Sequence, residues 1–343
     1  MAVQAILTRM IDINTTTDAA IEMGFPLITN VATLFSISHL FGTSKKRCGI
    51  YLLQFTDELF YFGQAVDVVR GFSQHRRNYD DIQGFSFIPI VKDSLNEVEK
   101  ELIFNAESLV FKLKNAVHVS SILGDTDFDL LMPISEQDAW LSATSQLATG
   151  ENQPKITLPE SQQVRFSKNF AQFTEHPSSQ AALMLLRQYI NECVPVPRRS
   201  EYSFWSVSCM PSTNKDTWPR LLCVNAAMME LFVVGWEKKT NLLWSFLTVD
   251  EDVLSDYWPS PDEFLKHFPD VEFVARGYRD AGQNQITLSC SGDTAMRRLL
   301  SDIGVCKAAA ALNIRVMRKR ANIYMKFHCV QLANQVFADS ANT

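Results

Sequence analysis

The sequence RCGIYLLQFTDELFYFGQAVDVV, residues 47–69, contains two apolar runs separated by the polar tripeptide Thr56-Asp57-Glu58. The triplet Gly49-Ile50-Tyr51 opens the first run, and Tyr61-Phe62-Gly63 closes the second. A short polar break between two strand-like runs is typical of a hairpin connection. The stretch therefore predicts two antiparallel strands, on which the Tyr51 and Tyr61 hydroxyls can face one site.

The pattern changes from strand to helix directly after this hairpin. Asp67 is placed to N-cap a helix that carries Arg70 and His75. A third strand-like run covers Phe85 to Val91, and Ser94-Leu95-Asn96-Glu97 then reads as a capping box for a second helix. The segment is thus expected to form a small unit of three antiparallel strands flanked by helices.

The composition is that of an ordinary globular protein. The 343 residues are 46% hydrophobic and 20% charged, which is enough to build a core in each of two or three domains. No apolar run reaches the roughly 20 residues of a membrane span, and the first residues do not read as a secretory signal. The formal net charge of −6 argues against a uniformly basic nucleic-acid coat, although local patches remain compatible with it.

The seven cysteines are dispersed and odd in number. This spacing argues against a secreted disulfide framework and against a four-cysteine zinc site. Together with the missing membrane span, it predicts a cytoplasmic protein with reduced thiols and no membrane association.

Changes in composition divide the chain into four expected regions. Residues 1–44 read as an N-terminal helical extension, and 45–120 contain the unit described above. A mixed, largely helical connecting region covers 121–198, with a linker near 149–163 where glycine, proline and polar residues concentrate. Residues 199–343 read as a separate domain of strands and helices. The expected fold class is therefore α+β, with a small first domain and a separate C-terminal α+β domain.

Apolar runs in the C-terminal region predict strands, and Asp293 is expected to cap a helix after them. The tryptophans of this region and the basic run Arg315–Arg320 are candidates for nucleic-acid contacts. Core packing and a solvated helix face explain them at least as well. The strand candidates are Leu221–Val224, Met229–Trp236 and Leu242–Val249, and a hairpin of Phe273–Tyr278 with Gln285–Cys290.

The order and spacing of the first unit resemble the GIY-YIG nuclease superfamily. Gly49-Ile50-Tyr51 matches the first half-motif, and Tyr61-Phe62-Gly63 matches the second with Phe in place of the usual Ile or Val. A helix with arginine and histidine and a later helix with glutamate follow in the same order. The similarity covers residues 47–114, about a fifth of the chain, and no resemblance is found for the rest.

This resemblance implies a metal-dependent endonuclease that hydrolyses phosphodiester bonds in DNA, double-stranded DNA above all, with Mg²⁺ or Mn²⁺ as cofactor. Glu99 would bind the cation, and Tyr51 would act as general base. Tyr61 would orient the attacking water or bind phosphate, and His75 would relay a proton. Arg70 is the nearest candidate for the phosphate clamp. The residues implied to contact the nucleic acid are Gly63, Gln64, Arg76 and Arg77.

Glu97, Glu99 and Glu101 follow one another on the second helix. Family members place the metal ligand in mid-helix, one turn before an aliphatic residue. Glu99, which Ile103 follows four residues later, fits that position. Glu97 is expected to be occupied by the capping box, and Glu101 lies on a different side of the helix. Most glutamates on helices are solvated, so the assignment of Glu99 depends on the motif that precedes it.

Two positions depart from the family pattern. Gly71 stands where members usually carry the arginine that clamps the phosphate, and Arg70 is its immediate neighbour. One residue along a helix turns a side chain by about 100°, so Arg70 is not an automatic replacement. Phe111 stands where the family has a polar residue. The glycine is compatible with natural variation, with a degenerate nuclease and with an engineered inactivation.

Two functions are therefore expected. The first is a GIY-YIG endonuclease that serves restriction, phage defence or a mobile element, which is the range of the superfamily. The second is a catalytically inactive nucleic-acid-binding or assembly protein that keeps the fold. In both cases the C-terminal domain is expected to recognise the target, or to bind a protein partner or a second copy of the chain.

Overall fold

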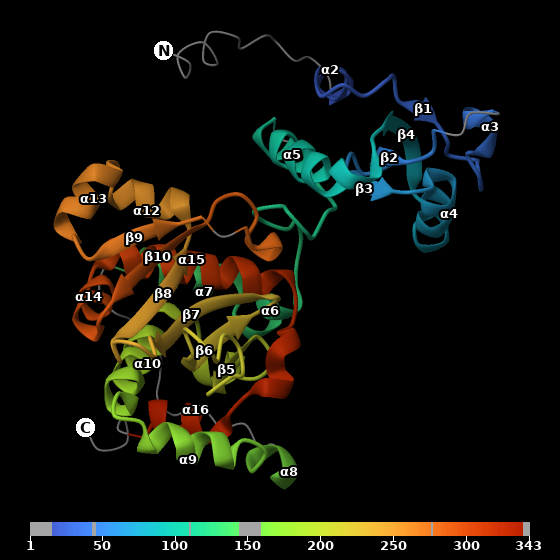
Figure 1. The fold of residues 1–343 in the computed structure, drawn as a ribbon. Coiled ribbons are helices and arrows are strands. Elements are labelled where there is room, and N and C mark those ends of the chain that lie inside the picture. The colour runs from blue at the N-terminus through green and yellow to red at the C-terminus, as the bar shows by residue number, and fades with distance from the viewer. Residues whose placement is uncertain (1–15, 43–45, 110, 144–158, 276, 339–343) are drawn as a thin grey trace. The chain divides into compact units, whose positions relative to one another are not determined.

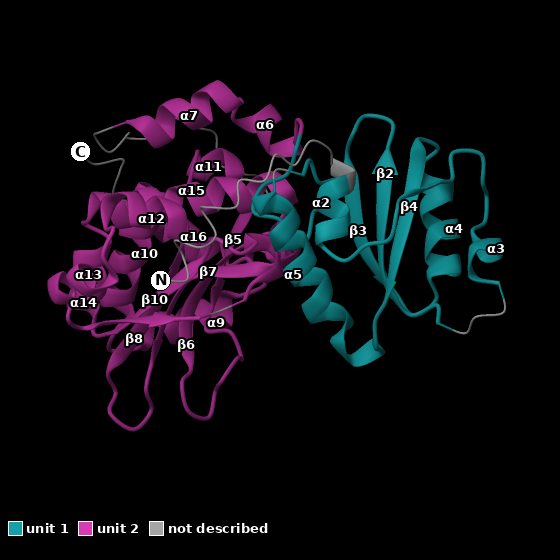
Figure 2. Ribbon diagram, turned by 90° about the horizontal axis from the view of Figure 1, so that it is seen from above, with its two compact units in different colours: residues 1–123 teal, residues 124–343 magenta. Residues whose placement is uncertain are grey.

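The computed structural model describes residues 16–42, 46–109, 111–143, 159–275 and 277–338 (Figure 1). The chain divides into two compact units, residues 1–123 and 124–343 (Figure 2). Most of the expected linker lies outside the described residues, as does the first part of the expected N-terminal helical extension. Among the helices of the described segments, none has the length and apolar character needed to span a bilayer.

The first unit is built on an antiparallel sheet of four strands in the order β1-β4-β2-β3. The expectation of three strands is corrected, because Thr29–Asn30 pairs with Phe85 and Gly84 of β4 as a short additional strand. The predicted order of hairpin, helix, strand and helix is present. Its helices and strands are α2 (Thr16–Glu22), β1 (Thr29–Asn30), α3 (Ser38–Phe41), β2 (Gly49–Phe55), β3 (Phe60–Ala65), α4 (Val68–Asn78), β4 (Ile82–Pro89), η1 (Lys92–Ser94) and α5 (Leu95–Ser108).

Strands β2 and β3 form the hairpin predicted from the sequence. Tyr51 lies opposite Gly63, and Gln54 lies opposite Phe60. Glu58 adopts a positive φ of 61° in the connecting turn. Because β2 lies between β3 and β4, it is buried along nearly its whole length, and its side chains are fixed by packing on both faces.

The side chains of this sheet alternate between two apolar cores. On one face Ile50 and Phe62 pack with Leu102 of α5. On the other face Tyr51 packs with Phe72 of α4. Helices α4 and α5 thus cover opposite faces, and both contact β3. This arrangement brings residues of both helices to the edge strand that carries the second half-motif.

The second unit contains an antiparallel sheet of six strands in the order β5-β6-β7-β8-β10-β9. Together with the first sheet, it establishes the mixed α+β class. The helices and strands are α6 (Asp127–Leu131), α7 (Ile134–Ser142), α8 (Glu160–Gln163), α9 (Ser167–Glu175), α10 (Ser179–Cys193), α11 (Pro197–Ser200), β5 (Trp205–Cys209), β6 (Arg220–Ala226), β7 (Met229–Trp236), β8 (Leu243–Val249), α12 (Glu251–Tyr257), α13 (Pro261–His267), β9 (Val271–Val274), η2 (Arg279–Ala281), β10 (Ile286–Ser291), α14 (Asp293–Leu299), α15 (Ile303–Lys319), η3 (Ile323–Phe327) and α16 (Val330–Val336).

Three adjacent strands of this sheet, β6, β7 and β8, lie where the sequence predicted strands. The further hairpin is present, since β9 and β10 pair in antiparallel fashion, but its first strand ends at Val274 and not at Tyr278. The predicted cap of the next helix is wrong. Gly292, with a φ of 83°, is the N-cap of α14, and Asp293 is the first residue of the helix. Glycine adopts this positive φ without steric cost. The helix therefore begins at Asp293, one residue earlier than a cap at Asp293 would place its start.

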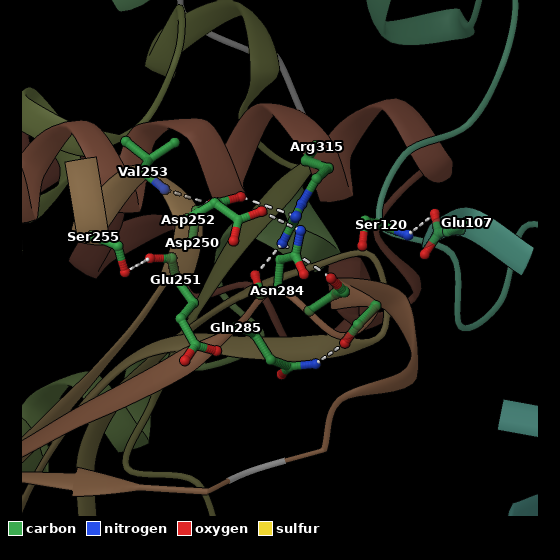
Figure 3. Close-up of polar contacts among 12 residues, drawn as sticks. Glu107, Ser120, Asp250, Glu251, Asp252, Val253, Ser255, Asn284, Gln285 and Arg315 are labelled. Atoms are coloured by element: carbon green, nitrogen blue, oxygen red, sulfur yellow. Dashed lines mark hydrogen bonds and ion pairs between the residues drawn. The ribbon is translucent and has the colours of Figure 1, made fainter. Parts of the chain in front are cut away.

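The basic run near the C-terminus is engaged within the second unit. Arg315 on α15 forms an ion pair with Asp250 at 2.9 Å and donates to the carbonyl oxygens of Ala281 and Asn284 (Figure 3). These contacts join α15 to the start of α12 and to the loop before β10. Two further arginines of the run form ion pairs inside the unit, Arg318 with Asp129 and Arg320 with Asp280.

Candidate active site

Tyr51 and His75 form the centre of the site in the first unit. The Tyr51 hydroxyl lies 2.7 Å from Nε2 of His75. Tyr51 comes from the central strand β2 and is only 3% exposed. His75 lies two turns into α4, which Asp67 starts, as predicted, by accepting from the backbone N–H groups of Val69 and Arg70. The helix start and the strand register together fix this hydrogen bond.

The protonation states of the pair follow from their burial. Burial raises the pKa of the Tyr51 phenol well above its ordinary value, and the charges of Tyr61 and Glu99 raise it further. Burial also lowers the pKa of His75 below 6.5. At neutral pH the phenol therefore donates to Nε2, and the proton of the neutral imidazole lies on Nδ1. Within the described residues, that Nδ1 atom is buried and has no hydrogen-bond partner.

Two further tyrosines surround His75. The Tyr61 ring centroid lies 4.9 Å from that of His75 and 6.3 Å from that of Tyr51. Tyr79, at the end of α4, stacks on His75 at 6.1 Å. Burial, with the charges of Glu99 and Tyr79, raises the pKa of Tyr61 to about 12. All three phenols are close to one imidazole, and the two motif tyrosines keep their protons at neutral pH.

Gly63 is required by the ring of Tyr51. Strand β3 continues past this glycine to Ala65. A Cβ atom at this position would lie 2.5 Å from the Tyr51 ring and 2.7 Å from the ring of Tyr61. Only glycine leaves room for the two tyrosines to converge above β3.

Glu99 is the glutamate of α5 that belongs to the site. It is half-buried, whereas Glu97 and Glu101 are exposed, and its charge raises the pKa of both motif tyrosines. The predicted capping box is wrong, because Ser94 ends the 3₁₀ turn η1 and makes no side-chain cap hydrogen bond. Glu97 is thus not held by a cap, and burial distinguishes Glu99 from it.

A single carboxylate is the metal donor that the site offers. Within the described residues, no cluster of three or more histidine, cysteine, aspartate or glutamate side chains could hold a metal ion. Mg²⁺ commonly binds to proteins through one or two carboxylates and keeps several of its waters. A carboxylate oxygen is the kind of ligand that such a hard cation prefers, and Glu99, which accepts from Nε2 of Gln64, is the carboxylate in question. Glu99 would therefore be its one anionic protein ligand.

Gly71 faces the site, and Arg70 does not. A Cβ atom on Gly71 would lie 3.3 Å from Cβ of Ala65 and 3.8 Å from Cε1 of Tyr51. A side chain at this position would therefore start beside the catalytic tyrosine candidate. Arg70 is exposed on the surface of α4. The structure does not bring its guanidinium into the Tyr51–His75 contact.

The two arginines that follow His75 differ in their surroundings. Arg77 is exposed. The guanidinium of Arg76 donates to the carbonyl oxygens of Val31, Asp80 and Ile82 and lies over the ring of Phe72. Arg76 thus joins α4 to the N-terminal segment and to β4, and both of its terminal nitrogens donate within the fold.

Three contributors to the site were not foreseen in their observed roles. Gln64 donates from Nε2 to Glu99 at 2.9 Å and to Asn96 at 2.7 Å. The buried Asn115 side chain pairs with the backbone N–H and C=O of Phe62 and supports the edge strand β3. The spacing of Asn96 and Glu99, three apart on one helix, is a signal that they share a face. The strand partner of that pair could not be identified from spacing.

Comparisons with known proteins add no further assignment: no protein family, no curated protein and no solved structure matches this chain.

Proposed function

We propose that the first unit is a metal-dependent phosphodiesterase of the GIY-YIG type that cleaves DNA. The observation that supports this proposal most strongly is the Tyr51–His75 hydrogen bond beside the Tyr61 ring, together with Glu99, which Gln64 of β3 contacts and whose charge raises the pKa of both tyrosines. These residues come from two strands and two helices that are far apart in sequence. A purely structural tyrosine pair does not require a neutral imidazole and a carboxylate beside it.

In hydrolysis these residues would have two roles, which are proton transfer and stabilisation of charge at the phosphate. His75 Nε2 is placed to take the proton of the Tyr51 hydroxyl, and Tyr51 can then remove a proton from the attacking water. Tyr61, with its proton retained, can donate a hydrogen bond to a phosphate oxygen. Glu99 would hold Mg²⁺ or Mn²⁺, which supplies charge stabilisation at the phosphate when it is bound. The exposed Arg70 and Arg77 are available to contact the DNA backbone.

The wild-type chain and a Gly71→Arg variant test the proposal together. We expect Mg²⁺- or Mn²⁺-dependent cleavage of plasmid DNA by the wild type, and cleavage about 10- to 100-fold faster by Gly71→Arg. The reason is that charge-assisted, bidentate contacts to phosphate are among the stronger polar interactions. Initial rates of plasmid nicking at several metal concentrations measure the difference.

Gly71→Ala is the matched control for this variant. Alanine removes the cost of a mid-helix glycine, about 1 kcal/mol, without adding a cation. A rate increase in Gly71→Arg but not in Gly71→Ala assigns the gain to the guanidinium. If neither the wild type nor Gly71→Arg cuts DNA or RNA, the hydrolase proposal is wrong.

The second candidate function is a non-catalytic nucleic-acid-binding or assembly protein that retains this fold. Gly71 is the observation that favours it, because the site lacks a cation on the face of α4 that points to Tyr51. Binding of labelled DNA with no cleavage at any metal concentration would support this alternative.

The pH dependence of cleavage tests the Tyr51–His75 pair. Because burial lowers the pKa of His75 below 6.5, the imidazole remains a proton acceptor from about pH 8 to below about pH 6.5. The wild-type rate is expected to stay level over this range and to fall only at lower pH. His75→Gln is expected to lose about 100-fold in rate and to lose the acidic decline. His39→Gln, on the exposed face of α3, is the control and should leave the profile unchanged.

A further inference from the structure

Gln64 occupies the position between the edge strand and the metal-ligand candidate. It follows Gly63 on β3 and lies opposite Ile50 of β2. Strand alternation directs it away from the Tyr51 face and toward the face that α5 covers. Its amide nitrogen reaches Oε2 of Glu99 at 2.9 Å and Oδ1 of Asn96 at 2.7 Å.

The chemistry of the three groups allows one orientation of this amide. An ionised carboxylate only accepts hydrogen bonds, so the NH₂ group of Gln64, and not its carbonyl oxygen, must face Glu99. The two amide hydrogens then divide between two acceptors, the Glu99 carboxylate and the Asn96 carbonyl. Both hydrogen bonds are short, and they come from two residues three apart on the same helix. Both hydrogens of the Gln64 amide are thereby engaged, which fixes its orientation.

The contact also restricts the carboxylate. Glu99 is carried by a helix side chain with several rotatable bonds, and its position relative to the sheet depends on what holds its oxygens. Gln64 is the strand residue that supplies such a contact, and its backbone is paired within the sheet. Partners that orient a metal ligand commonly matter for metal affinity nearly as much as the ligand itself.

We propose that Gln64 is the positioning residue of the metal ligand Glu99, a role that rests on the proposed function. Its amide, oriented by Asn96, holds the Glu99 carboxylate beside β3. The sequence assigned Gln64 to nucleic-acid contact. The structure assigns its amide to the carboxylate.

Binding of Mn²⁺ to the full-length protein, followed by the loss of the free-ion EPR signal, tests this role without relying on cleavage. Gln64→Leu keeps the approximate size of the side chain and removes both hydrogen bonds. We expect its Mn²⁺ affinity to fall about 10- to 100-fold. At saturating Mn²⁺, its cleavage rate is expected to return to within a few-fold of the wild type, as a positioning role requires. Gln83→Leu, an exposed glutamine on β4, is the matched control and should bind as the wild type does.

Asn96 supplies a second, independent variant. Asn96→Ala removes the acceptor that orients the Gln64 amide and is expected to weaken Mn²⁺ binding by a smaller factor than Gln64→Leu. Because Asn96 acts through Gln64, adding Asn96→Ala to Gln64→Leu should change the affinity no further. Additive losses in the double variant would contradict this order of contacts.

The outcomes separate this inference from the proposed function. If Glu99→Gln loses Mn²⁺ binding but Gln64→Leu binds as tightly as the wild type, the positioning role is wrong and the proposed function stands. If the wild type binds no Mn²⁺, both fail. A loss of affinity in Gln64→Leu with no change in Gln83→Leu supports the positioning role.

Discussion

Replacement of Glu99 by glutamine is expected to abolish metal-dependent cleavage, with a loss of about 1,000-fold or more in rate. Glutamine keeps the size of the side chain but removes the one anionic oxygen ligand that the site offers. A bound cation supplies several kcal/mol of charge stabilisation at the phosphate, and about 1.4 kcal/mol corresponds to a tenfold change in rate. Plasmid nicking with Mg²⁺ or Mn²⁺ in excess measures the loss.

Two neighbours of Glu99 provide matched controls on the same helix. Glu97 and Glu101 are exposed, so Glu97→Gln and Glu101→Gln are expected to cleave at the wild-type rate. Cleavage by Glu99→Gln equal to that of these controls would contradict the metal assignment.

A second measurement on Glu99→Gln is independent of metal. Burial, and after it the charge of Glu99, raises the pKa of Tyr61 to about 12. Removal of that charge is therefore expected to shift the Tyr61 titration to lower pH, followed by ultraviolet absorbance. An unchanged titration would mean that the carboxylate does not act on the tyrosines.

Local pattern predicted much of the site in the first unit. The alternation of strand residues and the polar triplet Thr56-Asp57-Glu58 specified the hairpin, because one turn with two flanking apolar runs sets the register. Asp67 was predicted as a helix cap because a side-chain acceptor before a helix has few other uses. The choice of Glu99 relied on the resemblance, and the structure adds two physical reasons, since Glu99 is half-buried and its charge raises the pKa of both tyrosines.

Features that depend on distant contacts were not predictable in this way. The strand Thr29–Asn30 has only two residues, and it exists because β4 offers its edge to the N-terminal segment. The segment Ser94–Glu97 matches a capping box, but the preceding 3₁₀ turn, which ends at Ser94, takes its place. The Gln64–Glu99 hydrogen bond joins residues 35 positions apart, and no local spacing encodes it. For the short strand and for Gln64, a tertiary contact decides between options that the local sequence leaves equal.

The role of a charged cluster was likewise not predictable from local sequence. The basic run of the second unit fits phosphate binding in sequence, but three of its arginines have acidic partners in the fold. The partners lie far away in the chain, on other helices and loops. Ion pairing within the unit therefore accounts for a cluster for which the sequence left both phosphate binding and a solvated helix face open.

The largest effect on stability is expected from Arg315→Met, which should lower the free energy of unfolding of the second unit by about 3–5 kcal/mol. The side chains of Arg315 and Asp250 are only 11% and 8% exposed, so the substitution leaves a buried carboxylate without its cation. Urea denaturation followed by tryptophan fluorescence measures the change. All six tryptophans lie in residues 124–343, so the signal reports on the second unit. Arg297→Met, which removes a half-exposed pair with Asp293, is the control and should cost less than about 1 kcal/mol.

The pH dependence and a double variant identify the buried charge as the cause. Burial already raises the pKa of Asp250 in spite of the nearby Arg315, and loss of the arginine should raise it further. The native state of Arg315→Met then holds a proton that the unfolded chain has released, so its stability falls as the pH rises through this window. The deficit should be smaller at about pH 5 than at about pH 8.

Asp250→Asn keeps the N-cap of α12, since asparagine caps as well as aspartate. Adding it to Arg315→Met should recover much of the lost stability. A deficit that is equal at both pH values and persists in the double variant would mean that packing of the arginine stem, and not its charge, stabilises the junction of α12 and α15.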